Sequence, residues 1–189
     1  MRIVIAEDEA IIRMDLREML QEHGCEVVGE ARSGAEALEA VRMTRPDCVF
    51  MDIQMNGRDG LDAACAVCEE GLAAVVVLTA FSQESFVKEA AEAGVMAYVT
   101  KPFSEADIMP ALHVARSRFE QTRALAAEVS DLQERLETRK LVERAKGILM
   151  RDGLDEAEAY LRLQRSAMSS RTPLKEIAQA VVTADALRA

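Results

Sequence analysis

The side chains best suited to chemistry in this chain lie where short apolar runs end. The set comprises two consecutive acidic residues, a further aspartate, a threonine and a lysine: Glu7, Asp8, Asp52, Thr79 and Lys101. Three carboxylates in one crevice repel one another unless a cation lies among them, and oxygen ligands of this kind suit Mg²⁺. A lysine ammonium and a threonine hydroxyl beside them would bind phosphoryl oxygens. The set therefore predicts attack of the Asp52 carboxylate on phosphorus, which gives an aspartyl phosphate.

Five apolar runs, which alternate with amphipathic segments up to about residue 110, predict how these side chains are brought together. The runs are Ile3–Ala6, Val27–Val28, Cys48–Met51, Val75–Leu78 and Ala97–Val99. The predicted helices between them are Ala10–Glu22, Ala35–Arg42, Leu61–Glu69 and Ser85–Ala93. Strands that alternate with helices of this length indicate an α/β fold built from βαβ units around a five-stranded parallel sheet. Parallel strands deliver their last residues to one edge, so the reactive side chains are expected to meet there.

Several residues predict where helices begin and end. Ser33, followed three residues later by Glu36, forms a capping-box pattern for the second helix. Gly24 and Gly94 stand where helix ends require a left-handed residue. Ser104 is expected to cap a fifth helix, in which Pro110 predicts a kink or a later start.

Residues 1–110 resemble a response-regulator receiver domain, which has a flavodoxin-like (βα)₅ fold. The resemblance rests on the acidic pair, the acceptor aspartate, Thr79-Ala80 and Lys101-Pro102-Phe103 at the matching strand ends, with Tyr98 three residues before the lysine. It implies that Asp52 takes a phosphoryl group from a histidine kinase. It also implies that the domain is no enzyme beyond its own phosphoryl transfer and slow dephosphorylation.

The same resemblance implies a role for each site residue. Asp8 and Asp52, with Glu7 acting through water and the Gln54 backbone carbonyl, would hold Mg²⁺. Thr79 and Lys101 would bind the phosphoryl oxygens, and Thr79 would move so that Tyr98 can turn inward as a switch. The sequence departs from the family at Met55-Asn56-Gly57, where the family usually has Met-Pro-Gly. Asparagine does not fix φ, so this departure predicts a somewhat looser loop with the chemistry retained.

The segment 111–138 is predicted to be a helical linker. Leu125, Val129, Leu132 and Leu136 repeat with the 4-3-4 spacing of a coiled coil, over about two heptads. Two interpretations stay open. The stripe forms an interchain seam in a homodimer through residues 118–138, with Glu128 and Arg135 at flanking positions, or the helix lies on its own receiver domain.

Residues 139–189 are predicted to form three short helices around a small core. Asp155 and Glu158 start the second helix, and Thr172-Pro173 starts the third with the proline in its first turn. Basic residues are dense in this segment: Arg139, Lys140, Arg144, Lys146, Arg151, Arg162, Arg165, Arg171 and Lys175. Composition alone favours a solvated basic face, with the Lys and Arg stems packed on it.

The order of residues in this segment resembles the ANTAR domain, a three-helix RNA-binding module of bacterial antitermination regulators. The resemblance covers roughly residues 130–185 and includes Ala145-Lys-Gly-Ile-Leu-Met150 and Ala167-Met-Ser-Ser-Arg171. It implies recognition of RNA hairpin loops, commonly in pairs and by a dimer. Lys146, Arg165 and Arg171 are the matching residues with charge to offer RNA. Packing roles are predicted for the apolar matches and for the sole aromatic: Ala145, Leu149, Met150, Ala157, Ala167, Met168, Ala178 and Tyr160.

Charge and cysteine usage set broader limits. Residues 1–110 carry 21 acidic and 9 basic side chains, a net charge of −12, whereas residues 111–189 carry 12 and 14, a net charge of +2. This asymmetry predicts two domains with different partners. The chain contains no apolar run of transmembrane length and begins without a signal-peptide pattern, so a cytoplasmic location is expected. The four cysteines are interpreted as buried free thiols, despite the C-x-x-C spacing of Cys65 and Cys68.

Together these observations predict a cytoplasmic response regulator in which phosphorylation at Asp52 switches RNA binding and so controls transcription by antitermination. Two alternatives stay open at this point. A DNA-binding response regulator would also carry a small, basic helical output, and a protein-interaction output would bind no nucleic acid. Binding to hairpin RNA and to duplex DNA in one competition assay distinguishes them.

Overall fold

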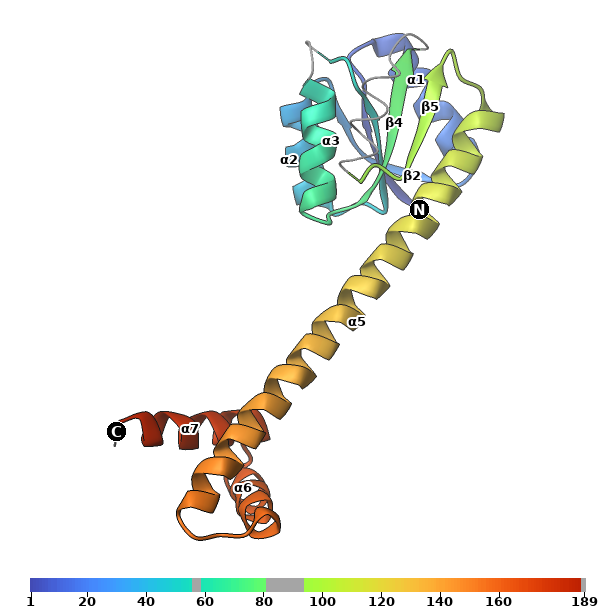
Figure 1. Ribbon diagram of the computed structural model, residues 1–189. Coiled ribbons are helices and arrows are strands. Elements are labelled where there is room, and N and C mark those ends of the chain that lie inside the picture. Colours follow the sequence, from blue (N-terminus) through green and yellow to red (C-terminus); the bar gives the residue numbers. More distant parts are fainter. Residues whose placement is uncertain (56–58, 81–93, 188–189) are drawn as a thin grey trace. The chain divides into compact units, whose positions relative to one another are not determined.

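The computed structural model describes residues 1–55, 59–80 and 94–187, and it divides into two compact units, Met1–Ala124 and Leu125–Ala189. The first unit is built on a parallel sheet of order β2-β1-β3-β4-β5 (Figure 1). Its strands are β1 (Arg2–Ala6), β2 (Glu26–Ala31), β3 (Cys48–Asp52), β4 (Ala74–Ala80) and β5 (Ala97–Lys101). Every pairing is parallel, which confirms the predicted sheet.

Helices cover both faces of this sheet. One buried cluster joins β1, β3 and β4 to α2 (Gly34–Thr44) and α3 (Asp59–Glu69), and the other joins the opposite sheet face to α1 (Ala10–Glu22) and to the first turns of α5. Figure 1 shows α2 and α3 side by side against the sheet. All five residues of β3 are buried, as expected for a central strand covered on both faces. The predicted helix Ser85–Ala93 lies outside the described residues.

Helix ends follow the local signals with one exception. Gly24 and Gly94 adopt the expected positive φ, +72° and +93°. Ser33 Oγ accepts a hydrogen bond from Glu36 N (3.2 Å), but the Glu36 carboxylate accepts from Arg32 N (2.9 Å) and not from the capping residue. The predicted capping box therefore forms only on the serine side.

Helix α5 runs without interruption from Glu105 to Arg151, a length of 47 residues. Pro110 lies inside it, so the predicted later start is wrong. Ser104 precedes the helix and donates from both its backbone N and its Oγ to the Asp107 carboxylate. The predicted linker, residues 111–138, is thus the interior of one helix, and the boundary between the two compact units falls within it.

In the second unit, the end of α5 packs with α6 (Glu156–Ser170) and α7 (Leu174–Ala186) around a small core. Asp155 and Glu158 form the predicted capping box in full. Helix α7 begins one residue later than predicted, so Pro173 occupies the capping position. The core side chains include Ala145, Leu163 and Val182. Among the described helices, none combines the length and the apolar character needed to cross a bilayer.

Candidate functional site

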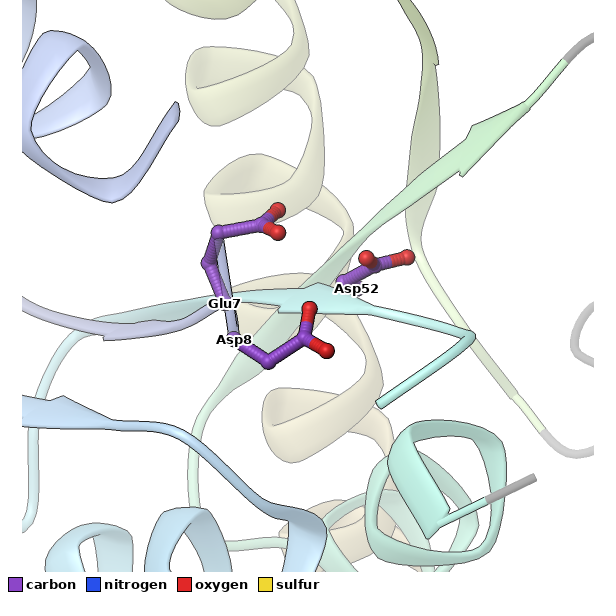
Figure 2. A group of neighbouring side chains, drawn as sticks. All are labelled: Glu7, Asp8 and Asp52. Atoms are coloured by element: carbon purple, nitrogen blue, oxygen red, sulfur yellow. The ribbon is translucent and has the colours of Figure 1, made fainter. Parts of the chain in front are cut away.

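Three carboxylates meet at the C-terminal edge of the sheet. Glu7 and Asp8 directly follow β1, and Asp52 is the last residue of the adjacent β3. One oxygen from each carboxylate lies within 4.8 Å of the others. Figure 2 shows the three side chains grouped around the ends of these two strands. The edge therefore brings together the acidic residues that the sequence predicted would meet.

Lys101, the last residue of β5, reaches the same group. Its Nζ lies 2.6 Å from Glu7 Oε2 and donates to Asp52 Oδ2 over 2.7 Å. Glu7 is fully buried and Asp52 is 6% exposed, so this ammonium balances charge that water cannot reach. The Lys101 ammonium is therefore placed to pair with a negatively charged group bound next to Asp52.

The surroundings raise the pKa values of Glu7 and Lys101. Burial raises the pKa of the Glu7 carboxyl, and the nearby Lys101 ammonium offsets this rise only in part. Burial lowers the pKa of the Lys101 ammonium, but the Asp52 and Glu7 carboxylates beside it outweigh this effect and leave the pKa above its ordinary value. Lys101 therefore stays protonated at neutral pH.

The donor set fits a hard divalent cation. Glu7 Oε2 is buried and, although close to the Lys101 ammonium, makes no well-directed hydrogen bond. Three carboxylates face a single lysine here, and carboxylate oxygens are the ligands that Mg²⁺ prefers. Gln54 lies two residues after the end of β3, and its backbone N donates to Asp52 Oδ1 over 3.1 Å. The arrangement is typical of a Mg²⁺ site.

Thr79 and Tyr98 occupy the neighbouring strands. Thr79 is 1% exposed near the end of β4, where it pairs in register with Thr100, and its Oγ1 donates to Ala80 O over 3.2 Å. Tyr98 lies on β5 and is 58% exposed. The two predicted switch residues thus differ sharply in burial in this conformation.

Two residues at this site were missed from the sequence. Gly60, in the first turn of α3, lies against the end of β3, because a Cβ at this position would stand 1.7 Å from Asp52 O. Arg13 is 7% exposed and donates from Nη1 to the backbone carbonyl of Glu7 over 2.6 Å. A signal for Arg13 did exist: it lies three residues before Leu16 and seven before Leu20, on the buried face of α1.

The C-x-x-C pair lies on α3 and is only half-buried. The cysteines among the described residues are free thiols, with Cys25 and Cys48 fully within the core. Burial raises the pKa of Cys68 to about 12, so this thiol is not activated for redox chemistry.

In the second unit, the predicted RNA-contact residues do not share one environment. Arg165 and Arg171 are exposed. Lys146, in contrast, is 8% exposed, and its Nζ donates to Glu143 (3.0 Å) and to Glu156 (2.8 Å). In this conformation Lys146 links α5 and α6, and it would have to leave these two carboxylates to contact RNA.

Several apolar residues predicted to pack in this unit are exposed. Met150, Tyr160 and Met168 are 44%, 41% and 74% exposed, and Ala157 is exposed as well. The packing prediction is wrong for these four, whereas Ala145, Leu149 and Ala178 are buried as predicted. Both methionines at these motif positions are therefore exposed, whereas the alanines divide between buried, intermediate and exposed positions.

Tyr160 borders a groove of about 620 Å³ between α5, α6 and the start of α7. Val142, Pro173 and Leu174 supply apolar walls, and Arg139 and Glu176 add charge at the edges. In all, four acidic and three basic residues line the groove: Asp131, Glu134, Glu143, Glu176, Arg135, Arg139 and Lys175.

The stripe on α5 is exposed along its whole length. Leu125, Val129, Leu132 and Leu136 are 62%, 52%, 55% and 53% exposed. Of the predicted flanking residues, Arg135 pairs with Asp131 of the same helix over 2.9 Å. Four large apolar side chains therefore form an exposed stripe on one face of α5, as an interchain seam would require.

Comparisons with known proteins match both units. The model of the response regulator receiver domain matches residues 3–113, and that of the ANTAR domain matches residues 130–182. The chain is 53% identical over 182 residues to the transcriptional regulatory protein PdtaR of Mycobacterium tuberculosis H37Rv, covering 96% of this chain and 89% of that protein.

Other relatives match the first unit alone. The chemotaxis protein CheY of Thermotoga maritima is 36% identical over 113 residues, which cover 59% of this chain and 94% of CheY. Among solved structures, the receiver domain of AraT, a response regulator from Geobacillus stearothermophilus, aligns with a TM-score of 0.56 at 34% identity, covering 65% of this chain and 97% of that one.

Proposed function

Because the chain belongs to the response regulators that join a receiver domain to an ANTAR antitermination RNA-binding domain, we propose that Asp52 accepts a phosphoryl group from a sensor histidine kinase. The chain is a regulator and not a classical enzyme. The proposal assigns residues 1–110 to the receiver, 111–138 to the linker and 139–189 to the RNA-binding output. Phosphorylation would then control binding to RNA hairpins in a target transcript.

The observation that carries this proposal is the position of Lys101 between two buried carboxylates. An Asp52 oxygen attacks phosphorus, and the bond from phosphorus to the kinase histidine nitrogen breaks, with its electron pair left on nitrogen. Lys101 and Thr79 then bind phosphoryl oxygens at the ends of β5 and β4. Asp8, Asp52 and the Gln54 carbonyl, with Glu7 acting through water, would hold Mg²⁺, which would supply positive charge opposite these oxygens.

The switch in this proposal is the pair Thr79 and Tyr98. Thr79 is buried beside the acceptor strand, so a shift toward the phosphoryl group would vacate space next to β5. Tyr98 is exposed and has room to turn inward. The exposed tyrosine supports the view that the described conformation is the unphosphorylated one.

Labelling tests the acceptor directly. A small phosphodonor with Mg²⁺ should label Asp52, and the label should be stable in acid and labile in base, as acyl phosphates are. Asp52→Asn should lose the label, whereas Asp15→Asn, which changes an exposed aspartate on α1, should keep it. Full labelling of the Asp52→Asn protein would refute the proposal.

For the output, we assign phosphate contacts to the exposed Arg165 and Arg171 and a stacking contact to Tyr160. Arg171 follows the last residue of α6 in a left-handed conformation (φ 55°), three positions before α7 begins at Leu174. Tyr160 lines the groove beside Arg139, where an unpaired loop base could stack on its ring. Lys146 is left out, because two carboxylates already occupy its ammonium.

A homodimer through α5 fits this output. Nine residues separate Leu136 from the buried Ala145, and at 3.6 residues per turn this places them about 180° apart around the helix. The exposed stripe therefore faces away from the core that α5 shares with α6 and α7. Two chains joined along this stripe would keep both three-helix modules free, one for each hairpin of a pair.

DNA binding and a purely protein-binding output are the alternatives. Competition between a hairpin RNA and a duplex DNA of matched length separates the first from the proposal, since RNA should win at every salt concentration. Binding that is insensitive to salt and to RNA would favour the second, because contacts with phosphates weaken as salt rises.

A further inference from the structure

One buried charge of the first unit has no part in the chemistry proposed above. The buried polar or charged residues among those described are Glu7, Arg13, Asp52, Thr79 and Lys146. Glu7, Asp52 and Thr79 belong to the phosphorylation site, and Lys146 belongs to the second unit. Arg13 lies on α1, away from the strand ends, and a buried arginine is costly unless its donors are satisfied.

The donors of Arg13 are satisfied by the backbone of the acidic pair. Nη1 donates to Glu7 O over 2.6 Å and approaches Asp8 O at 3.4 Å. These carbonyls belong to the two residues whose carboxylates point into the cation site. Arg13 therefore contacts the segment that aims both side chains and not the side chains themselves.

Few other contacts hold this segment. Glu7 N donates to Ala31 O of β2 over 3.1 Å, and Glu9 N donates to Glu7 Oε1 over 3.2 Å. Asp8 lies beyond the last paired residue of β1 and is exposed. The Arg13 contact is thus the one hydrogen bond found to the Asp8 carbonyl among the described residues, and rotation at this peptide would swing the Asp8 carboxylate.

The charge of Arg13 is balanced on its other side. Its Nε donates to Glu30 Oε2 over 3.1 Å, and Arg17 Nη1 donates to the other Glu30 oxygen over the same distance. A planar guanidinium can serve both the carbonyls and the carboxylate at once, which a lysine ammonium cannot do in the same geometry. Glu30 also offsets a positive charge that would otherwise repel a metal ion nearby.

We infer that Arg13 is a positioning residue for the Mg²⁺ site, which fixes the Glu7-Asp8 backbone so that both carboxylates meet the ion, with Glu30 as its anchor. This inference rests on the proposed function. Mg²⁺ demands near-ideal octahedral geometry, so small errors in ligand position cost affinity. Residues that orient metal ligands typically contribute 10–100-fold to metal affinity.

The sign of the effect is diagnostic. If Arg13 acted only as a nearby positive charge, its removal would tighten Mg²⁺ binding. If Arg13 positions the ligands, its removal weakens binding despite the lost repulsion. Arg17 is the matched control, because it shares the Glu30 carboxylate but donates to neither carbonyl in the described structure.

The test measures Mg²⁺ affinity of the unphosphorylated full-length protein by titration calorimetry. Arg13→Gln should weaken Mg²⁺ binding about tenfold or more, Arg13→Lys by less, and Arg17→Gln by less than about twofold. Labelling of Asp52 at saturating Mg²⁺ should stay near the wild-type rate in Arg17→Gln, because Arg17 donates to Glu30 and to neither carbonyl of the acidic pair in the described structure.

Each outcome decides between the alternatives. Equal or tighter Mg²⁺ binding by either folded Arg13 variant overturns the inference, as does equal weakening in Arg17→Gln. Loss of folding in both Arg13 variants, seen in the melting transition without Mg²⁺, would make Arg13 a residue of the fold and also overturn it. Failure of the wild-type protein to bind Mg²⁺ would instead contradict the proposed function, which requires a Mg²⁺ site.

Discussion

Each of the two units holds one largely shielded lysine between two carboxylates, yet the exposure of those carboxylates differs. In the receiver, Lys101 meets Glu7 and Asp52, whose side chains are 0% and 9% exposed. In the ANTAR unit, Lys146 meets Glu143 and Glu156, whose side chains are 59% and 70% exposed. The ammonium is similarly shielded in both, but only the first pair of carboxylates is cut off from water.

This difference decides the role of each lysine. Buried carboxylates from separate strands repel one another strongly, so they favour any ligand that adds positive charge, and Lys101 is placed to meet a phosphoryl group as well. Exposed carboxylates are screened by water and contribute little to stability when paired. Lys146 therefore links two helices, while Lys101 belongs to the proposed phosphorylation site.

The largest effect expected from this comparison is on phosphorylation. Lys101→Met should slow labelling of Asp52 about 100-fold or more, because it removes a donor aimed at the developing charge. Lys146→Met, the matched change in the other unit, should leave the labelling rate unchanged. Rates from rapid-quench labelling at saturating Mg²⁺ check this. A comparable loss in both variants would erase the distinction.

A second prediction concerns apolar side chains, which the receiver buries and α5 exposes. Leu132→Glu should leave the chain folded but convert a dimer into a monomer that binds paired hairpins poorly, because a charge cannot be buried in an apolar seam. Ser130→Glu, on another face of the same helix, should not. Two heptads are marginal alone, so the dimer should strengthen on phosphorylation. Sedimentation velocity measures the oligomeric state of each variant and its change on phosphorylation. A wild-type protein that is monomeric with and without phosphorylation would contradict the interchain seam.

Next in size is the effect of the exposed aromatic. Tyr160→Leu should weaken binding of a hairpin loop about tenfold, whereas Tyr160→Phe should retain it, because stacking needs the ring and not the hydroxyl. Arg165→Ala and Arg171→Ala should each flatten the salt dependence of binding by about one unit. Lys146→Met should do neither once the folded fraction is matched. Fluorescence anisotropy at several salt concentrations tests all five variants, and a salt slope altered by Lys146→Met would reverse the assignment.

The smallest effect is on stability and its pH dependence. Folding raises the pKa of Glu7 above its ordinary value of 4.5. Above pH 4.5 the folded chain therefore keeps a proton on Glu7 that the unfolded chain has lost, and the stabilisation from this proton is lost as the pH rises through the folded pKa. Glu7→Gln should therefore gain melting temperature over wild type above about pH 4.5 without Mg²⁺. The hydrogen bond from Lys146 lowers the pKa of Glu156, so Glu156→Gln should show a small loss above that pH instead. Equal pH profiles for the two variants would contradict the comparison.

The receiver site could be predicted because its residues are tied to the sheet. Asp52, Lys101 and the acidic pair follow apolar runs whose direction is set by parallel pairing, so the meeting point follows from topology alone. Burial of Arg13 was not predicted, because a single charged residue does not alter the amphipathic pattern of α1, and charged residues usually lie on the exposed face. Gly60 escaped because its close contact with Asp52 depends on where α3 approaches β3.

The ANTAR unit could be predicted only in outline. Its helices and the Asp155 cap follow from local signals, whereas the environment of Lys146 depends on where Glu156 falls after the turn between α5 and α6. Three short helices leave much of each surface open, so a methionine such as Met168 can match a motif and still face solvent. The resemblance identified the family there, but physical patterning did not separate core from surface.

The contact of Gly60 with Asp52 limits how this receiver can diverge. Every amino acid other than glycine places a carbon atom where the Asp52 carbonyl oxygen already stands. A randomised library at position 60, selected for phosphorylation, should return glycine, while neighbouring exposed positions such as Asp62 or Glu69 drift with the choice of kinase or dimer partner. The proposed acceptor, Asp52, therefore restricts a second position, residue 60, almost entirely to glycine.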